Sequence, residues 1–193
     1  KKKLIVIYQS TNRKKINFKK KENIIIFVGR LNSSKGYDVF GRAVLNILNK
    51  YPKWSSIVIG DEPREKIIFK HKRLKILGFK RNDLVSKWFS KSSISVVCSR
   101  KEEPFGRTAL EASSCGCAVI ISNRGGLPEA SPFAIKINTL NVLSIEKAII
   151  KLVNDKKERN KLQKKIYENF NLTNEYVTNI IDNYRYKLLK NIL

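Results

Sequence analysis

The chain has 193 residues, of which 42% are hydrophobic and 9% aromatic, enough to bury one ordinary core. Lys and Arg number 40 against 16 Asp and Glu, and the net charge of +24 favours phosphates, nucleic acids or anionic membrane surfaces as partners. The apolar runs are far shorter than the roughly 18 residues of a membrane span, and three Cys with one His form no zinc pattern.

The rest of the composition indicates a reducing compartment. The cysteines, Cys98, Cys115 and Cys117, are odd in number and lack paired spacing, so we expect buried, reduced thiols and neither a metal nor a cofactor. The sequence lacks Met even at position 1 and opens on lysines instead of a signal peptide, so we expect a cytoplasmic piece of a longer protein. Abundant Lys is also what an AT-rich genome produces, which leaves the meaning of the charge open.

Short apolar runs alternate with longer segments of helical period, which is typical of βαβ units. A first strand is predicted at Leu4 to Tyr8, followed by a basic linker over Gln9 to Asn23 and a buried strand at Ile24 to Val28. Apolar residues at helical spacing then predict an amphipathic helix from Gly36 to Asn49. A strand at Ile57 to Ile59 and a helix at Glu62 to Lys70 follow.

The second half continues the alternation. Its predicted elements are a strand at Leu74 to Leu77, a helix at Asp83 to Phe89 capped by Asn82, a strand at Ile94 to Cys98, a helix at Gly106 to Ser114, and strands at Ala118 to Ile121 and Ala134 to Ile137. Three helices close the chain, at Ile145 to Leu152, Lys156 to Phe170 and Asn174 to Leu189. The order predicts an α/β fold, a Rossmann-like doubly wound parallel sheet with C-terminal helices.

The buried strand at 24–28 runs into a turn that contains Gly29, Arg30, Lys35 and Gly36. Open α/β sheets bind ligands at the carboxyl ends of their strands, where this turn lies. An Arg fork and a Lys ammonium suit the two phosphates of a diphosphate, and Gly allows close backbone approach. A glycine turn with solvated cations is the alternative interpretation.

Acidic residues gather in the loop and helix that follow the strand at 94–98. Glu103 belongs to the loop, and Glu111 lies early in the helix. The free amides of Gly106, Arg107 and Thr108, with the helix dipole, form an anion site. A diphosphate bound there would hold its sugar and ribose toward the two carboxylates, which accept hydrogen bonds from hydroxyls. The alternative is that both glutamates only offset nearby cations.

A third turn, Asn123 to Glu129, follows the strand at 118–121 and lies at the same edge of the sheet. Its Pro and Glu suit the first turn of a helix. A plain turn between strand and helix explains this segment equally well. Because three glycine-bearing turns lie at the carboxyl ends of parallel strands, we expect them to converge on one pocket.

Together these pieces resemble the carboxyl-terminal, donor-binding domain of the retaining glycosyltransferases of family 4, the glycogen-synthase-like enzymes with the two-domain GT-B fold. The matching pieces are Val28 to Leu31 with Lys35 and Gly36, Ile59 and Gly60, Leu77 to Phe79, Ser99 to Ala112, Cys115 to Ile120, and Gly125 to Glu129. They follow in family order from about Ile24 to the end. The segment from Pro128 to Leu143 is shorter than usual, and Gln9 to Thr11 departs from the family's linker.

The resemblance implies a role for each matching residue. Arg30 and Lys35 would hold the donor's phosphates and take up charge on the leaving diphosphate, without a metal. Glu103 would contact the transferred sugar. The donor-binding residues that it implies are Gly29, Phe105, Gly106, Arg107, Thr108, Glu111, which would bind the ribose, and Phe79, which would lie beside the nucleobase.

The resemblance also divides the chain. Residues 1–23 would be an N-terminal strand and basic linker, residues 24–173 a nucleotide-sugar-binding domain, and residues 174–193 a helix that packs on this domain or on a partner domain. The N-terminal partner domain that carries the acceptor site in the family is missing from these residues. The expected partners are a nucleotide sugar, an acceptor glycan or lipid-linked sugar, and the anionic inner face of the cell membrane.

The predicted function is donor binding for the transfer of a sugar, with retained anomeric configuration, from a nucleotide diphosphate sugar to a glycan, lipid-linked or small-molecule acceptor, as in bacterial polysaccharide biosynthesis. The chain alone is expected to bind donor without transferring much. A basic nucleic-acid-binding module without catalysis is the alternative, favoured by the charge of +24. Against it, the cations are spread over the chain, and the sequence has no helix-turn-helix, RNA-binding or zinc motif.

Overall fold

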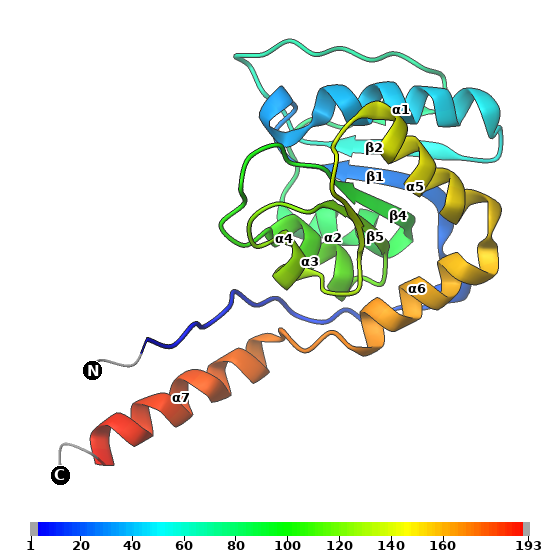
Figure 1. Cartoon of the computed structure of the whole chain (residues 1–193). Coiled ribbons are helices and arrows are strands. Elements are labelled where there is room, and N and C mark those ends of the chain that lie inside the picture. The colour runs from blue at the N-terminus through cyan, green and yellow to red at the C-terminus, as the bar shows by residue number, and fades with distance from the viewer. Residues whose placement is uncertain (1–3, 191–193) are drawn as a thin grey trace.

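The centre of the protein is one sheet of six parallel strands, seen in a computed structural model that describes residues 4–190 (Figure 1). The strands are β1 (Glu22–Val28), β2 (Ser55–Ile59), β3 (Leu74–Ile76), β4 (Ser92–Val97), β5 (Ala118–Ser122) and β6 (Ile135–Ile137). They lie in the order β3-β2-β1-β4-β5-β6, and every neighbouring pair is parallel. Because the order reverses between β1 and β4, the sheet is doubly wound, which confirms the predicted Rossmann-like fold.

Helices cover both faces of the sheet. They are α1 (Tyr37–Lys50), α2 (Asn82–Lys91), α3 (Arg107–Ser114), α4 (Leu127–Ala130), α5 (Val142–Asn154), α6 (Lys156–Glu168) and α7 (Asn174–Lys190), with 3-10 turns η1 (Phe18–Lys20) and η2 (Ser33–Lys35). Core residues of α1 and α5 pack on one face, and those of α2, α3, α4 and α6 pack on the other. The last helix, α7, extends away from the sheet near the N-terminal segment (Figure 1).

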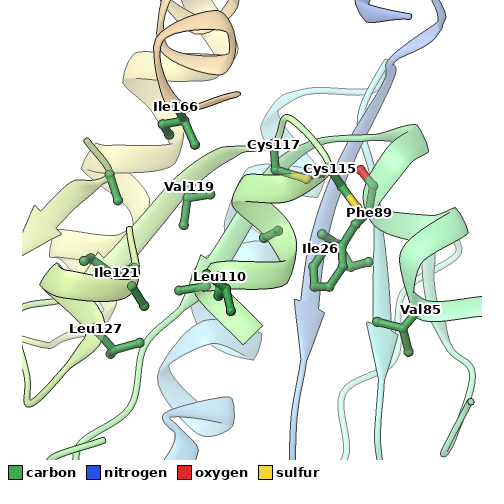
Figure 2. Close-up of a cluster of buried hydrophobic side chains, with 14 of the residues drawn as sticks. Ile26, Val85, Phe89, Leu110, Cys115, Cys117, Val119, Ile121, Leu127 and Ile166 are labelled. Atoms are coloured by element: carbon green, nitrogen blue, oxygen red, sulfur yellow. Dashed lines mark hydrogen bonds between the residues drawn. The ribbon is translucent and has the colours of Figure 1, made fainter. Parts of the chain in front are cut away.

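The central strand β1 shows why the strand predictions succeed. Ile25 and Phe27 pack with α1 and α5, whereas Ile24 and Ile26 pack with α2 and α3. Because both faces are covered, consecutive positions of the strand are apolar. Figure 2 shows the second of these groups, with Phe89 of α2 near Ile26.

The predicted first strand, Leu4 to Tyr8, is wrong. Residues 4–17 form no helix or strand. This segment runs near α7 (Figure 1), and its Tyr8 contacts the side chains of Glu129 and Phe105 instead of the backbone of a strand. Residues 1–3 of the predicted N-terminal segment and residues 191–193 of the predicted last segment lie outside the described residues.

The predicted helix at Glu62 to Lys70 is also wrong. From residue 65 to residue 70, partly buried and exposed positions alternate, which is the period of an extended chain. Phe69 packs edge-on against Tyr37, with ring centroids 5.5 Å apart, so the segment lies over α1 without coiling.

The predicted cap of α2 is also wrong. Asn82 is the first residue of α2 and not its cap; Arg81 occupies the N-cap position.

The basic linker is bound to the domain along its length. The amide of Thr11 donates to the carbonyl of Leu172 at 3.1 Å, and that of Lys14 donates to the carbonyl of Ser114 at 3.2 Å. The phenol of Tyr167 donates to the carbonyl of Lys14 at 2.6 Å. The linker is therefore held between α3 and the α6–α7 connection.

All three cysteines are buried and unpaired, as predicted. Burial raises the pKa of Cys98 to about 12 and that of Cys117 to about 11. These thiols stay protonated near neutral pH and serve packing, since the thiolate is the reactive form.

Lys21 ties the start of β1 to the helix ends beside it. Its ammonium donates hydrogen bonds to the carbonyls of Phe89 at 3.0 Å, Ser92 at 2.8 Å and Cys115 at 2.8 Å. These carbonyls lie at the carboxyl ends of α2 and α3, where helices leave acceptors unpaired. Burial lowers the pKa of the Lys21 ammonium.

Replacing Lys21 should therefore destabilise the fold strongly. We expect Lys21→Met to lower the free energy of unfolding by about 3 kcal/mol, because three partly buried carbonyls lose a charged donor while the apolar stem is kept. Urea denaturation measures the change. Lys20→Met, at an exposed neighbour, is the matched control and should change it by less than about 0.5 kcal/mol. Equal losses in the two variants would contradict this role of Lys21.

Candidate functional site

The turns that leave β1, β4 and β5 lie together at the carboxyl edge of the sheet. The predicted convergence on one pocket holds for the turns after β1 and β4, whereas no residue of the third turn, Asn123 to Glu129, lines the cavity at this edge. The turn after β1 is shaped by Asn32, whose side chain accepts from the Lys35 amide at 3.0 Å and donates to the Glu62 carboxylate at 2.9 Å. Gly36 ends the turn at a φ of 73°, in the left-handed region. These contacts aim Lys35 across the edge toward the loop after β4.

Arg100 joins this turn to the loop after β4. Its amide donates to the Ser34 carbonyl at 2.9 Å, and its guanidinium binds both oxygens of Asp38, at 2.5 and 2.7 Å. Burial would raise the pKa of the Asp38 carboxyl, but the hydrogen bond and charge of Arg100 outweigh it and hold this pKa below its usual value. A two-point contact of this kind fixes the distance between the two turns.

Lys35 and Glu103 meet at the centre of the edge. Their ammonium nitrogen and carboxylate Oε1 are 2.5 Å apart, and the two side chains are 30% and 15% exposed. Both line a cavity of about 290 Å³. The residues around it are Gln9, Phe27, Val28, Gly29, Lys35, Val97, Cys98, Ser99, Glu103, Pro104, Phe105, Gly106, Arg107 and Thr108.

The start of α3 forms one wall of the cavity. Gly106 is the N-cap at a φ of 102°, and the buried Phe105 precedes it. The first amides of a helix have no acceptor within the helix, so Arg107 and Thr108 present N–H groups where the helix dipole is positive. Together with Lys35, this wall is suited to an anion.

Three of the predicted site residues lie outside this cavity. Glu111 sits on the second turn of α3, where burial raises its pKa and the charge of Arg107 opposes that shift; the guanidinium is 3.3 Å from its carboxylate. Arg30 is exposed beside Gly29. Phe79 follows β3 and is 71% exposed. Within residues 4–190 the structure thus gathers Gly29, Lys35, Glu103 and the residues from 105 to 108 around the cavity, and leaves these three outside it.

The third predicted turn supports the site from behind. The amide of Gly126 donates to the backbone carbonyl of Glu103 at 2.7 Å, and that of Gly125 donates to the carboxylate of Glu102. A Cβ on Gly126 would lie 2.6 Å from the Cα of Phe105, so only glycine permits this approach. The turn therefore fixes the backbone that carries Glu103.

Two polar residues of the cavity were missed by the sequence analysis. Ser99 lies two residues after the end of β4, so its place at the carboxyl edge could have been inferred from the strand order. Gln9 belongs to the linker, and no local pattern signals its position.

The described part of the chain contains neither a metal site nor a membrane-spanning helix. Across residues 4–190 no three His, Cys, Asp or Glu side chains are arranged to hold a metal ion. Each helix there is too short or too polar to cross a bilayer.

The sequence pattern of the family described as Glycosyl transferases group 1 matches residues 9–169. The chain belongs to this family. It is 34% identical over 128 residues to an uncharacterized glycosyltransferase of Methanocaldococcus jannaschii, covering 60% of this chain and 32% of that protein. The chain spans only a quarter to a third of the length of the curated relatives that it matches first.

Solved structures share the fold of this glycosyltransferase domain. The C-terminal domain of the group 1 protein LpcC from Francisella tularensis superposes with a TM-score of 0.67 at 28% identity, covering 78% of this chain and 85% of that one. HepE of Anabaena, solved in complex with UDP-glucose, gives a TM-score of 0.69 at 17% identity, covering 84% and 49%. The six-stranded sheet thus matches one Rossmann-like half of a GT-B glycosyltransferase.

The glycosyltransferase domain should tolerate alanine at Gly78 but not at Gly36. Both glycines have left-handed backbones, with φ of 68° and 73°, but a Cβ on Gly78 meets nothing within 4 Å, whereas one on Gly36 collides with the Cys98 carbonyl. We expect Gly78→Ala to cost about 1 kcal/mol of unfolding free energy and Gly36→Ala about 3 kcal/mol, measured by urea denaturation. Similar losses would mean that backbone angle alone, and not the contact between turns, matters at Gly36.

Proposed function

We propose that this chain is the donor-binding domain of a retaining, family 4 glycosyltransferase that takes a hexosyl group from a nucleotide diphosphate sugar. The acceptor would be a glycan, a lipid-linked sugar or a small molecule. Membership of the group 1 family supports this proposal, as does the fold shared with HepE, which was solved with UDP-glucose.

The observation that carries the proposal is the Lys35–Glu103 pair facing the amides of α3 in one cavity. A diphosphate needs cations and N–H donors, and a sugar needs carboxylate acceptors. Lys35 and the α3 amides supply the first set within the cavity, and Glu103 supplies the second. A cavity of about 290 Å³ is at the small end of ligand sites, which fits the diphosphate and sugar portion of the donor.

In the proposed reaction the protein's own charges stabilise the leaving group. The bond between the sugar's anomeric carbon and the diphosphate oxygen breaks, and negative charge grows on the diphosphate. The acceptor's hydroxyl oxygen forms the new bond to that carbon and gives its proton to the leaving diphosphate. Lys35 and the amides of Arg107 and Thr108 take up this charge, so neither a metal nor a cofactor is needed. The diphosphate competes with Glu103 for the Lys35 ammonium, which leaves the Glu103 carboxylate available to orient the sugar hydroxyls.

The three predicted site residues outside the cavity would bind the rest of the donor. Glu111 is proposed to accept hydrogen bonds from the ribose hydroxyls, and Phe79 to lie beside the nucleobase. Arg30 is exposed next to Gly29, so its long side chain is proposed to reach the phosphates from the rim.

The surroundings of α7 suggest where a second domain sits. We propose that residues 24–173 bind donor and that residues 174–193 pack on an N-terminal acceptor domain. Tyr186, Leu188 and Leu189 on α7 are exposed, as are Leu4 and Val6. We also propose a cytoplasmic location with a peripheral contact to anionic membrane, and the net charge of +24 supports that contact.

Calorimetric titration with UDP, GDP, ADP, CDP and pyrophosphate at moderate salt tests the proposed function, because salt screens nonspecific attraction to the basic chain. One nucleoside diphosphate should bind clearly tighter than pyrophosphate. Lys35→Ala should weaken that nucleotide roughly 10- to 100-fold, and Glu111→Ala should remove the advantage over pyrophosphate.

The matched control is Lys161→Ala, which removes an exposed cation on α6. It should leave nucleotide affinity within about twofold, because one distant charge is screened. If all five ligands bind alike and the Lys35, Glu111 and Lys161 variants behave alike, binding is driven by charge, and the donor assignment fails.

A further inference from the structure

Tyr8 attaches the N-terminal segment to the wall of the donor cavity. Its ring stacks on Phe105 with centroids 5.4 Å apart and planes 23° from parallel. Its phenol donates a 2.5 Å hydrogen bond to Glu129 of α4, and this bond raises the phenol's pKa. Tyr8 therefore touches both the residue that precedes the α3 amides and the short helix behind the Glu103 loop.

Gln9 lines the same cavity as Lys35 and Glu103. It lies between two anchored neighbours, because Tyr8 is bound to Glu129 on one side and the Thr11 amide donates to Leu172 on the other. The Gln side chain offers two N–H donors and one carbonyl acceptor, which suit phosphate oxygens or sugar hydroxyls. Anchoring on both sides lowers the entropy that Gln9 loses when it binds.

We infer that Tyr8 and Gln9 both contribute to ligand binding at the donor site. Tyr8 is a positioning residue that holds Phe105, and with it the amides of Arg107 and Thr108. Gln9 is a binding residue that contacts the phosphate or sugar part of the ligand. This inference rests on the proposed function.

The placement of these two residues has a structural consequence. Residues 4–7 are exposed, with Leu4 96% and Val6 74% accessible, and form no strand. Their contact with the cavity therefore depends on Tyr8.

Titration of the 193-residue chain with the tightest-binding of UDP, GDP, ADP and CDP tests this inference, together with the melting temperature of each variant. Tyr8→Ala should weaken nucleotide affinity about tenfold, because it removes both the stack and the hydrogen bond. Tyr8→Phe keeps the stack and should lose about threefold or less, and Gln9→Ala should lose about threefold to tenfold. Tyr186→Ala, an exposed tyrosine on α7, is the matched control and should bind like the unaltered chain.

A merely structural Tyr8 would lower the melting temperature of Tyr8→Ala and leave its affinity unchanged, which overturns the inference. The inference is also overturned if Tyr8→Ala and Gln9→Ala both keep the nucleotide affinity of the unaltered chain while Lys35→Ala binds weakly. In that case the proposed function stands. If Lys35→Ala also binds like the unaltered chain, the proposed function fails, and the inference fails with it.

Discussion

Backbone contacts that only glycine allows hold together the turns at the carboxyl edge of the sheet. A Cβ on Gly60 would collide with the backbone of the turn after β1, and one on Gly36 would collide with the carbonyl of Cys98 after β4. Gly126, after β5, approaches the loop of Glu103 in the same way. Turns from four strands thus pack backbone to backbone, which brings them within reach of one another's side chains. The approach of Lys35 to Glu103 depends on this spacing.

Carboxylates that bind groups of these turns also hold the turns together. The chain has only 16 acidic residues, yet five of them bind groups of these turns: Asp38 to Arg100, Glu62 to Asn32, Glu65 to the Ser33 amide, Glu102 to the Gly125 amide and Glu103 to Lys35. Like charges on neighbouring basic turns would otherwise repel. These five carboxylates therefore serve to position the turns, whereas most of the excess Lys and Arg residues lie elsewhere on the surface.

The sequence predicts those parts of the molecule that depend on local pattern. Apolar runs locate β1, β2, β4 and β5, which are covered on both faces, whereas the edge strands β3 and β6 each carry a Lys between two apolar residues. The strand order then brings Lys35 and Glu103 to one edge. The apolar residues of the segment at 65–70 are spaced in a way that fits either a helix or an extended chain. Only the packing of this segment over α1 shows that it is extended. The places of Gln9 and Arg100 depend on contacts between residues more than 50 positions apart in the chain, which no local pattern encodes.

On the proposed function, the Lys35–Glu103 pair lets one cavity bind both the diphosphate and the sugar of the donor. A partly buried pair gains little net energy from its own attraction, because both groups lose water, but leaving either group alone is costly. A ligand that supplies only an anion would neutralise the charge of Lys35 but leave the Glu103 carboxylate without a partner. A ligand that supplies only hydroxyls would have to displace Lys35 from Glu103 and leave it uncompensated. On the proposed function, a sugar diphosphate would supply an anion to Lys35 and hydroxyl donors to Glu103 at once, so the exchange would leave neither group without a partner.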